Sequence, residues 1–404
     1  MRTHLENGLF YIFYLFNTAG LPFGLNWSNL LSPILVLHLF FTKKIKVVLL
    51  FLFFLLMYML IQYTTEPYPK FIELKSFFLS SGYFFTSIIS MLYFYFFLQK
   101  RYIQGEVEAI FKNLLKINAI FTAIALAIYF TPLQEYMWGV SKNINIDGQV
   151  RLKMFFSEPS HYGYISMTLL LYVTFKVVLL KQYRYLFLFF MTFLSAWLCQ
   201  STGTLGALFL ALILSLIIYA RLIIKRYLLQ IFSIIILIAV VLTFFGDRLL
   251  SRLDKVVAGE DHSGQVRVVF STLAGYYLIE KYNIYFGVGF GQAKNYVTQY
   301  THKFHGYKSD RLPSSFASTI STVGLIGIFL KYLTLFFFMI RYSVYSNVFQ
   351  LTLFFYALIY GFTGGWLLNT YELYLWALAF LKIFPEFEYK KLLNTKRKTE
   401  CTYL

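Results

Sequence analysis

Long runs of apolar residues without a single charge dominate this chain. Residues 47–64 and 76–99 contain no Asp, Glu, Lys or Arg, and residues 316–330 repeat the pattern. A helix needs roughly 20 such residues to cross the hydrocarbon core of a membrane. Only 13% of all residues are charged, against about 25% in ordinary soluble domains. The sequence therefore excludes a soluble enzyme, a disordered chain and a coiled coil, and it predicts an all-α membrane protein.

The apolar runs predict a polytopic bundle of about twelve transmembrane helices. They lie near 8–24, 28–41, 45–63, 76–99, 114–132, 161–180, 183–199, 203–222, 227–245, 316–340, 347–366 and 371–384. Four regions follow from this division. They are a membrane region at 1–245 that includes an exterior loop at 133–160, a large exterior loop at 246–315, a second membrane region at 316–385 and a basic tail at 386–404.

The distribution of basic residues predicts the orientation. An even number of spans places both termini on one side, and the short loops of that side hold most of the Lys and Arg residues. The opposite short loops hold only Lys70, Lys75, Lys142, Arg151 and Lys153. Because basic residues favour the cytoplasmic side, we expect cytoplasmic termini and exterior loops at 133–160 and 246–315. The net charge of +18 then reflects orientation and contact with anionic membrane lipid, and no nucleic-acid partner is expected.

The larger exterior loop has the periodicity of helices. One apolar seam consists of Leu249, Leu250, Leu253, Val256 and Val257, and a second consists of Val266, Phe270, Leu273 and Tyr277. This spacing predicts two amphipathic helices packed on the outer face of the membrane domain. The sequence Gly-Val-Gly-Phe-Gly at 287–291 follows no βαβ pattern and predicts a tight turn.

Glu158 begins the sixth predicted span. Pro159 suits the first turn of a helix, where its missing N–H is not needed, so Glu158 lies at the helix cap and its charge is favoured by the helix dipole. One interpretation is a plain helix start. The other is a carboxylate held at the membrane surface, which could accept a proton from a sugar hydroxyl or orient an arginine.

Further candidate residues gather in the two exterior loops. The arginines are Arg151, Arg248, Arg252, Arg267 and Arg311. Arginine binds phosphate through two parallel hydrogen bonds and stays charged, so the set favours a phosphate site, although each one could instead be a solvated or paired loop charge. His302 and His305 could act as acid or base or could simply be solvated. Lys331 falls inside a span, where ionisable residues are costly and often functional. It could instead reach the interface by snorkelling, or the helix boundary could shift.

Several kinds of chemistry lack their sequence signals. There is no Walker loop for ATP-driven transport. There is no clustered set of His and Cys residues for a metal site, and no acyl-transfer serine motif. We therefore expect neither a metal nor a cofactor.

These residues resemble, in order, elements of the O-antigen polymerase and ligase superfamily of polysaccharide-assembly membrane proteins. The similar elements are Glu-Pro-Ser within 156–163, Ser-Thr-Gly-Thr at 201–204, Gly-Gln-Val-Arg at 264–267, the glycine turn at 287–291, Pro-Ser-Ser at 313–315 and Val-Gly-Leu-Ile-Gly at 323–327. Together they cover about residues 150–330. The resemblance implies a GT-C-like membrane glycosyltransferase in the bacterial cytoplasmic (inner) membrane, with its active site facing the periplasm.

The resemblance also implies a substrate and roles for the candidates. The growing glycan would move from undecaprenyl pyrophosphate to the non-reducing end of a new lipid-linked repeat unit. Arg151, Arg267 and Arg311 would bind the pyrophosphate, with Arg248 and Arg252 as weaker candidates. Glu158 is the first choice of base and His305 the second. The sequence leaves open whether a separate protein regulates chain length.

Two alternatives remain open. An O-antigen-type ligase would move the glycan to lipid A core, but the ligase-like His-x-x-Asn element is replaced here by Leu-Pro-Ser-Ser at 312–315, which favours the polymerase. A flippase for lipid-linked oligosaccharides would have a similar number of spans. Transporters often show paired broken helices, and the sequence shows no such pairing.

Overall fold

The computed structural model describes residues 2–16, 27–65, 73–140, 150–156, 158–219, 262–305, 312–365, 367 and 370–392. Helices dominate these residues, and their strands are confined to one two-stranded ribbon. The prediction of a mostly helical chain is confirmed at this level.

The first half of the chain forms helices before and after the two-stranded ribbon in the sequence. Before it come α1 (Arg2–Phe16), α2 (Trp27–Phe41), α3 (Ile45–Thr64), α4 (Leu74–Ile103), α5 (Val107–Ala127) and the single turn α6 (Gln134–Met137). Strand β1 (Trp138–Val140) pairs antiparallel with β2 (Val150–Leu152), which places Gly139 opposite Arg151. After it come α7 (Pro159–Val178), η3 (Tyr183–Tyr185), α8 (Leu186–Leu198) and α9 (Thr202–Ile218).

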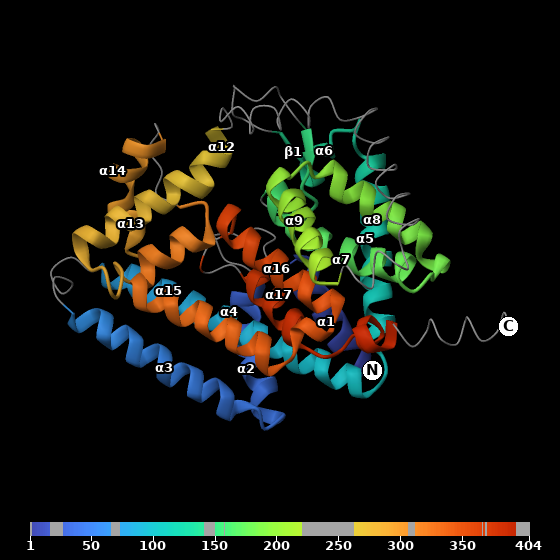
Figure 1. Cartoon of the computed structure of the whole chain (residues 1–404), viewed down its shortest axis with the longest axis horizontal. Coiled ribbons are helices and arrows are strands. Elements are labelled where there is room, and N and C mark those ends of the chain that lie inside the picture. The colour runs from blue at the N-terminus through green and yellow to red at the C-terminus, as the bar shows by residue number, and fades with distance from the viewer. Residues whose placement is uncertain are drawn as a thin grey trace.

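The second half contributes two groups of helices. The first group is α12 (His262–Gln265), the π-helical turn η4 (Val266–Phe270), α13 (Ser271–Tyr282) and α14 (Ala293–His305). Then come α15 (Ser315–Arg341), η5 (Val344–Ser346), α16 (Val348–Thr363), α17 (Thr370–Phe380) and η6 (Pro385–Phe387). In Figure 1, α12 lies along the same edge of the molecule as β1 and α6.

Four helices are long and apolar enough to cross a membrane: α3, α4, α5 and α15. On α3, Leu50, Phe53 and Phe54 are each more than half exposed. A continuous apolar surface of this kind is rare on soluble proteins, so these helices suggest a membrane protein. The full count of twelve spans stays a prediction, and the span expected at 227–245 lies outside the described residues.

Helix α7 forms the centre of the molecule. Nearly every residue between Tyr162 and Phe175 is buried, and α7 packs against α8, α9 and α16. Its Tyr172 ring lies 4.9 Å from the ring of Phe111 and 5.6 Å from that of Phe384. Aromatic packing of this kind adds about 0.5–1.5 kcal/mol per pair beyond simple area burial. The core therefore fixes the position and direction of α7.

Two groups of ion pairs, one of which includes Lys176 in the last turn of α7, together form what we call the ionic layer. One group consists of Glu6, Lys100, Arg101 and Glu106, and the other consists of Glu108, Lys176, Arg184 and Glu386. Buried Lys176 contacts Glu386 at 3.0 Å and Glu108 at 3.5 Å. Buried Arg101 contacts Glu106 at 2.7 Å and Glu6 at 3.1 Å. Charges that the sequence presents as flanking residues are thus neutralised inside the protein.

The second predicted amphipathic helix is present, but its expected apolar seam is wrong. Leu273 and Tyr277 are 37% and 39% exposed, whereas Ala274 and Leu278 are fully buried. Small residues allow α13 to approach α15 closely on this buried face. A Cβ added to Gly275 would lie only 3.0 Å from the carbonyl oxygen of Ala317 on α15. The helix predicted around residues 249–257 lies outside the described residues.

Helix α15 is not the single straight span that the sequence predicted at 316–340. Sixteen residues of straight helix would separate Ser315 from Lys331 by about 24 Å, yet Lys331 Nζ lies 3.2 Å from Ser315 Oγ. Gly324 causes the reversal, with a φ of 65° and a ψ of −168°. The helix therefore has a first half at 315–323 that folds back beside a second half at 325–341.

The glycine turn at 287–291 closes the break in α15. The N–H of Val288 donates to the carbonyl of Ser321 (2.8 Å), and the N–H of Leu325 donates to the carbonyl of Ile284 (2.9 Å). Gly287, Gly289 and Gly291 all have positive φ values, which confirms the predicted turn. A Cβ on Gly287 would lie 2.5 Å from the Gly324 nitrogen, so only glycine fits this contact.

Helix α3 is joined to the same break by two polar side chains. Gln62 Nε2 donates to the carbonyl of Thr322 (2.9 Å), and Tyr58 Oη donates to the carbonyl of Val323 (2.7 Å). A helix break within an apolar region exposes backbone groups that need such partners. The side chains of α3 supply them.

Candidate functional site

The N-terminus of α7 places Glu158 as predicted. Glu158 is the N-cap residue, with φ −136° and ψ 147°, and Pro159 occupies the first turn. The side chain makes no capping hydrogen bond. It is exposed and accepts a hydrogen bond from Ser160 Oγ at 3.2 Å. The Glu158 carboxylate is therefore not used to cap the backbone N–H groups of α7.

The loop between α8 and α9 holds the start of α7 in place. Cys199 Sγ donates a hydrogen bond to the carbonyl of Pro159 at 2.7 Å. A Cβ added to Gly163 would lie 2.9 Å from both Cys199 Sγ and Thr204 Oγ1. The glycine thus permits the polar step at 201–204 to pack directly on the first turn of α7, which fixes the direction of Glu158.

His161 and Tyr360 lie near both Glu158 and Arg267, the first-choice base and one of the candidate pyrophosphate-binding arginines. The charges of Glu158 and Arg267 act on His161, which is half-buried, and the same two charges act on Tyr360 near the C-terminal end of α16. Segments distant in the sequence therefore converge at the start of α7. The sequence analysis gave His161 no role, although it follows Glu158 by three residues and so lies on the same face of the first turn.

Arg267 comes from the π-helical turn η4. The N–H of Ser271 donates to the carbonyl of Val266, five residues earlier, which inserts one extra residue into the turn. Such single π turns occur frequently at functional sites. Arg267 is half-buried, and among the described residues it forms no ion pair.

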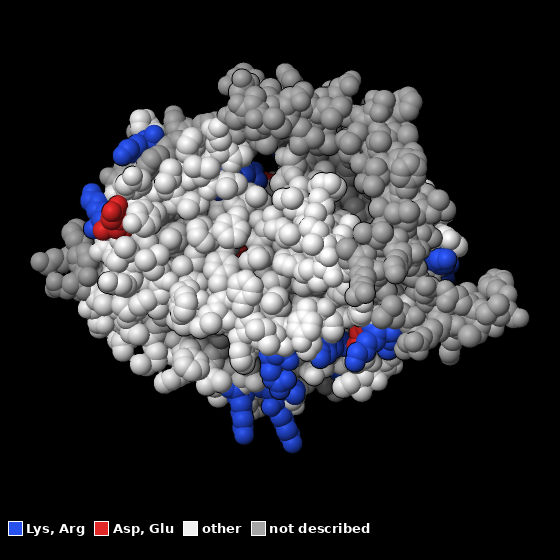
Figure 2. All heavy atoms as spheres, in the orientation of Figure 1, with Lys and Arg blue, Asp and Glu red and all other residues white. Residues whose placement is uncertain are grey.

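Arg151 lies in the middle of β2. It pairs with Gly139 across the ribbon, and its charge acts on Cys199, the residue that holds Pro159. We define the α7 site as Arg151, Glu158, His161, Arg267 and Tyr360. Figure 2 shows an opening between the positions of α12 and α9 in which atoms of basic and acidic side chains are visible.

The other predicted residues lie on α14 or outside the described part of the chain. His305 is the last residue of α14, and α14 packs against η4, but the His305 side chain is not described. His302 is exposed on the same helix. Arg248, Arg252 and Arg311 lie outside the described residues. Within the described residues, no group of three or more His, Cys, Asp or Glu side chains could hold a metal ion.

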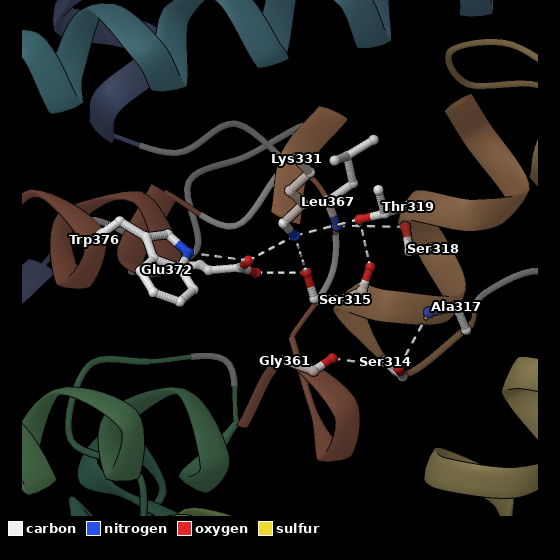
Figure 3. A network of polar contacts seen from close by, with 10 residues as sticks. All are labelled: Ser314, Ser315, Ala317, Ser318, Thr319, Lys331, Gly361, Leu367, Glu372 and Trp376. Atoms are coloured by element: carbon white, nitrogen blue, oxygen red, sulfur yellow. Dashed lines mark hydrogen bonds and ion pairs between the residues drawn. The ribbon is translucent and has the colours of Figure 1, made fainter. Parts of the chain in front are cut away.

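Lys331 does not reach the interface as the sequence analysis expected. Figure 3 shows it turned toward α17, where its Nζ lies 2.8 Å from Glu372 Oε1. It also donates to Ser315 Oγ (3.2 Å) and Thr319 Oγ1 (3.4 Å). Glu372 is buried and accepts a hydrogen bond from Ser315 Oγ at 2.5 Å. The lysine is neutralised inside the protein because a carboxylate is placed opposite it.

The α7 site can bind an anion and move a proton. Guanidinium groups and a helix N-terminus both favour phosphate oxygens, and a carboxylate beside an imidazole can accept a proton from a hydroxyl. A scan against protein-family models and a search of curated proteins return no match for this chain.

Proposed function

We propose that this chain is a membrane glycosyltransferase that polymerises a surface polysaccharide. It would transfer the growing glycan from undecaprenyl pyrophosphate to the non-reducing end of a new lipid-linked repeat unit, on the outer face of the bacterial cytoplasmic membrane. One observation carries the proposal. The turn η4, which carries Arg267, packs against α16, and α16 packs against α7, which begins directly after Glu158.

The proposed reaction assigns a role to each charge. A bond forms between the acceptor hydroxyl oxygen and the anomeric carbon, and the bond from that carbon to the pyrophosphate oxygen breaks. Arg267 and Arg151 stabilise the negative charge that builds on the pyrophosphate. Glu158 accepts the proton of the acceptor hydroxyl, and His161 lies beside it to hold the carboxylate or share the proton. Arg311, Arg248, Arg252 and His305 remain sequence-based candidates.

The arrangement of charges on the surface supports the proposed orientation. In Figure 2, Lys and Arg side chains gather along the edge of the molecule opposite β1 and α12. Basic residues favour the cytoplasmic face, so the α7 site would face the exterior. The substrate class comes from the resemblance of residues 150–330 to the polymerase and ligase superfamily.

Product formation from a purified substrate tests the proposal. We would incubate the detergent-purified protein with a lipid-linked oligosaccharide repeat unit, without nucleotide or added metal, and separate the products on a gel. A ladder of integral repeat units is expected for the wild type. The ladder should disappear in Arg267→Ala and persist in Arg184→Ala, a matched arginine in the ionic layer. Product on lipid A core alone would indicate a ligase instead.

The broken helix α15 favours one second candidate, a flippase. Discontinuous helices and buried ionisable side chains are common at transporter substrate sites, and α15 combines the Gly324 break with the Lys331–Glu372 pair. A flippase would move the lipid-linked oligosaccharide across reconstituted vesicles without changing its length. Unchanged glycan length together with transport would replace the polymerase proposal.

A further inference from the structure

The Lys331–Glu372 pair joins three segments of chain. Lys331 lies on the second half of α15, Ser315 and Thr319 lie on the first half, and Glu372 lies in the first turn of α17 (Figure 3). Both oxygens of Glu372 are used, because Oε1 accepts from Lys331 and Oε2 accepts from Ser315 Oγ. The pair therefore holds the folded-back half of α15 against α17.

The folded-back half in turn holds the end of α16. The N–H of Ser315 donates to the carbonyl of Gly364 at 3.0 Å, and Ser314 Oγ donates to the carbonyl of Gly361 at 3.4 Å. Ser314 also caps its own helix, accepting from the N–H of Ala317 at 3.2 Å. Two consecutive serines thus carry the constraint from the ion pair to the last turn of α16.

The last turn of α16 is the part that carries Tyr360 into the α7 site. A Cβ added to Gly364 would lie 2.6 Å from Tyr360 Cζ and 2.7 Å from its Oη, so the phenol rests directly on this glycine. On its other side the ring lies 4.2 Å from the ring of Tyr164. The charge of Glu372 also reaches Tyr164. The Tyr360 ring therefore contacts Gly364, whose carbonyl accepts the N–H of Ser315, and the ring of Tyr164.

We propose that Lys331 and Glu372 are positioning residues of the α7 site, acting through Ser315 and Gly364 on Tyr360. This inference rests on the proposed function. The pair touches no candidate for the chemistry directly. It fixes the backbone on which the Tyr360 phenol rests. Helix α16, which carries this phenol, packs against η4 of Arg267, and a Cβ on Gly203 in the polar step at 201–204 would lie 3.9 Å from the Tyr360 ring.

Three variants separate this role from simple support of the fold. Glu372→Gln removes the charge opposite Lys331, and Gly364→Ala displaces the Tyr360 phenol without changing the pair. Glu386→Gln is the matched control, because it removes one of the two acids that contact Lys176 in the ionic layer. If Glu372→Gln does not fold, the double variant Lys331→Met/Glu372→Gln replaces it, since neutralising both partners of a buried pair costs little.

The expected kinetic result is a lower kcat with an unchanged KM. Glu372→Gln and Gly364→Ala should each reduce kcat about tenfold, which corresponds to about 1.4 kcal/mol, when measured well below the melting temperature. The combined variant Glu372→Gln/Gly364→Ala should lose no more than either single variant, because both changes act through the Tyr360 phenol. Glu386→Gln combined with Gly364→Ala should give simply additive effects.

Hydrogen exchange supplies a readout that needs no activity. In Glu372→Gln, the amides of residues 357–365 should exchange faster than in the wild type, and in Glu386→Gln they should not. Unchanged exchange in that segment, or additive kinetic effects of Glu372→Gln and Gly364→Ala, would overturn the positioning role alone. A wild-type protein that forms no ladder would overturn the proposed function, and the positioning role with it.

Discussion

Charged side chains at the two ends of α7 differ in whether they form ion pairs. At the C-terminal end, buried Lys176 contacts two carboxylates, Glu386 and Glu108. At the N-terminal end, Glu158 and Arg267 both act on His161, yet within the described part of the chain neither forms an ion pair. A charge that is neutralised inside a protein supports its fold, whereas the Glu158 carboxylate is exposed and accepts a hydrogen bond from Ser160. This difference favours the N-terminal end as the site that we propose.

Removing the carboxylate from the N-terminal end should have the largest effect. Glu158→Gln keeps the size of the side chain but cannot accept the proton of the acceptor, so the rate of ladder formation should fall by about 10²–10⁴-fold. The melting temperature should stay near that of the wild type, because Glu158 makes no capping bond. Full polymer formation by this variant would remove Glu158 from the mechanism.

Removing the lysine from the C-terminal end should give the opposite pattern. Lys176→Met leaves the carboxylates of Glu108 and Glu386 without their shared buried cation. It should cost about 1–3 kcal/mol of stability, because both carboxylates are partly exposed and Glu108 keeps its ion pair with Arg184. The rate per folded molecule should not change. Thermal unfolding in detergent, followed by activity measured at low temperature, checks both parts, and a specific loss of kcat at full folding would contradict the comparison.

The arginine from the exterior loop should affect the transition state more than the fold. Arg267→Ala should reduce kcat by about 10²–10³-fold, the usual effect of losing one donor to a developing negative charge. Arg267→Lys should recover only part of this rate, because lysine lacks the paired donors of a guanidinium group. Equal rates for the lysine variant and the wild type would show that only the charge matters.

The smallest predicted effect concerns acid and the ionic layer. Burial alone would raise the pKa of Glu6, which precedes the first predicted span, but the hydrogen bond from Lys100 and the charges of Lys100 and Arg101 together lower this pKa below its ordinary value of 4.5. A lowered pKa in the folded state stabilises the protein above pH 4.5, and this contribution disappears as the pH falls through the lowered value. Unfolding midpoints measured from pH 6 down to pH 3 should therefore fall less steeply for Glu6→Gln. Parallel curves for the two proteins would contradict this role.

Local features of the site could be predicted from the sequence because they depend on neighbouring residues. Pro159 after Glu158 indicates a helix start, and the glycines at 287–291 indicate a turn. Contacts between distant segments could not be predicted in the same way. Glu372 lies 41 residues beyond Lys331, and apolar periodicity does not show that Gly324 reverses its helix. The error at Leu273 has a similar cause, since the face that α13 buries is decided by close approach to Ala317 on another helix.

The ranking of the five candidate arginines came from the family resemblance and not from their own chemistry. Their chemistry is the same in isolation, and only the packing of η4 against α16 brings Arg267 near Tyr360. His161 was overlooked for a related reason. His161 at the start of a helix has no distinctive sequence signal, and its relation to Arg267 depends on how a distant segment folds.

The closure of the α15 break has a consequence for the order in which the chain assembles during synthesis. Gln62 and Tyr58 leave the ribosome long before their partners, because the carbonyl groups that they bond belong to residues 322 and 323. Helix α3 must therefore wait, with these polar side chains unsatisfied, until 260 more residues have been made. A chain truncated before residue 322 would keep these groups exposed in the apolar phase, where membrane proteases and chaperones can recognise unfinished molecules.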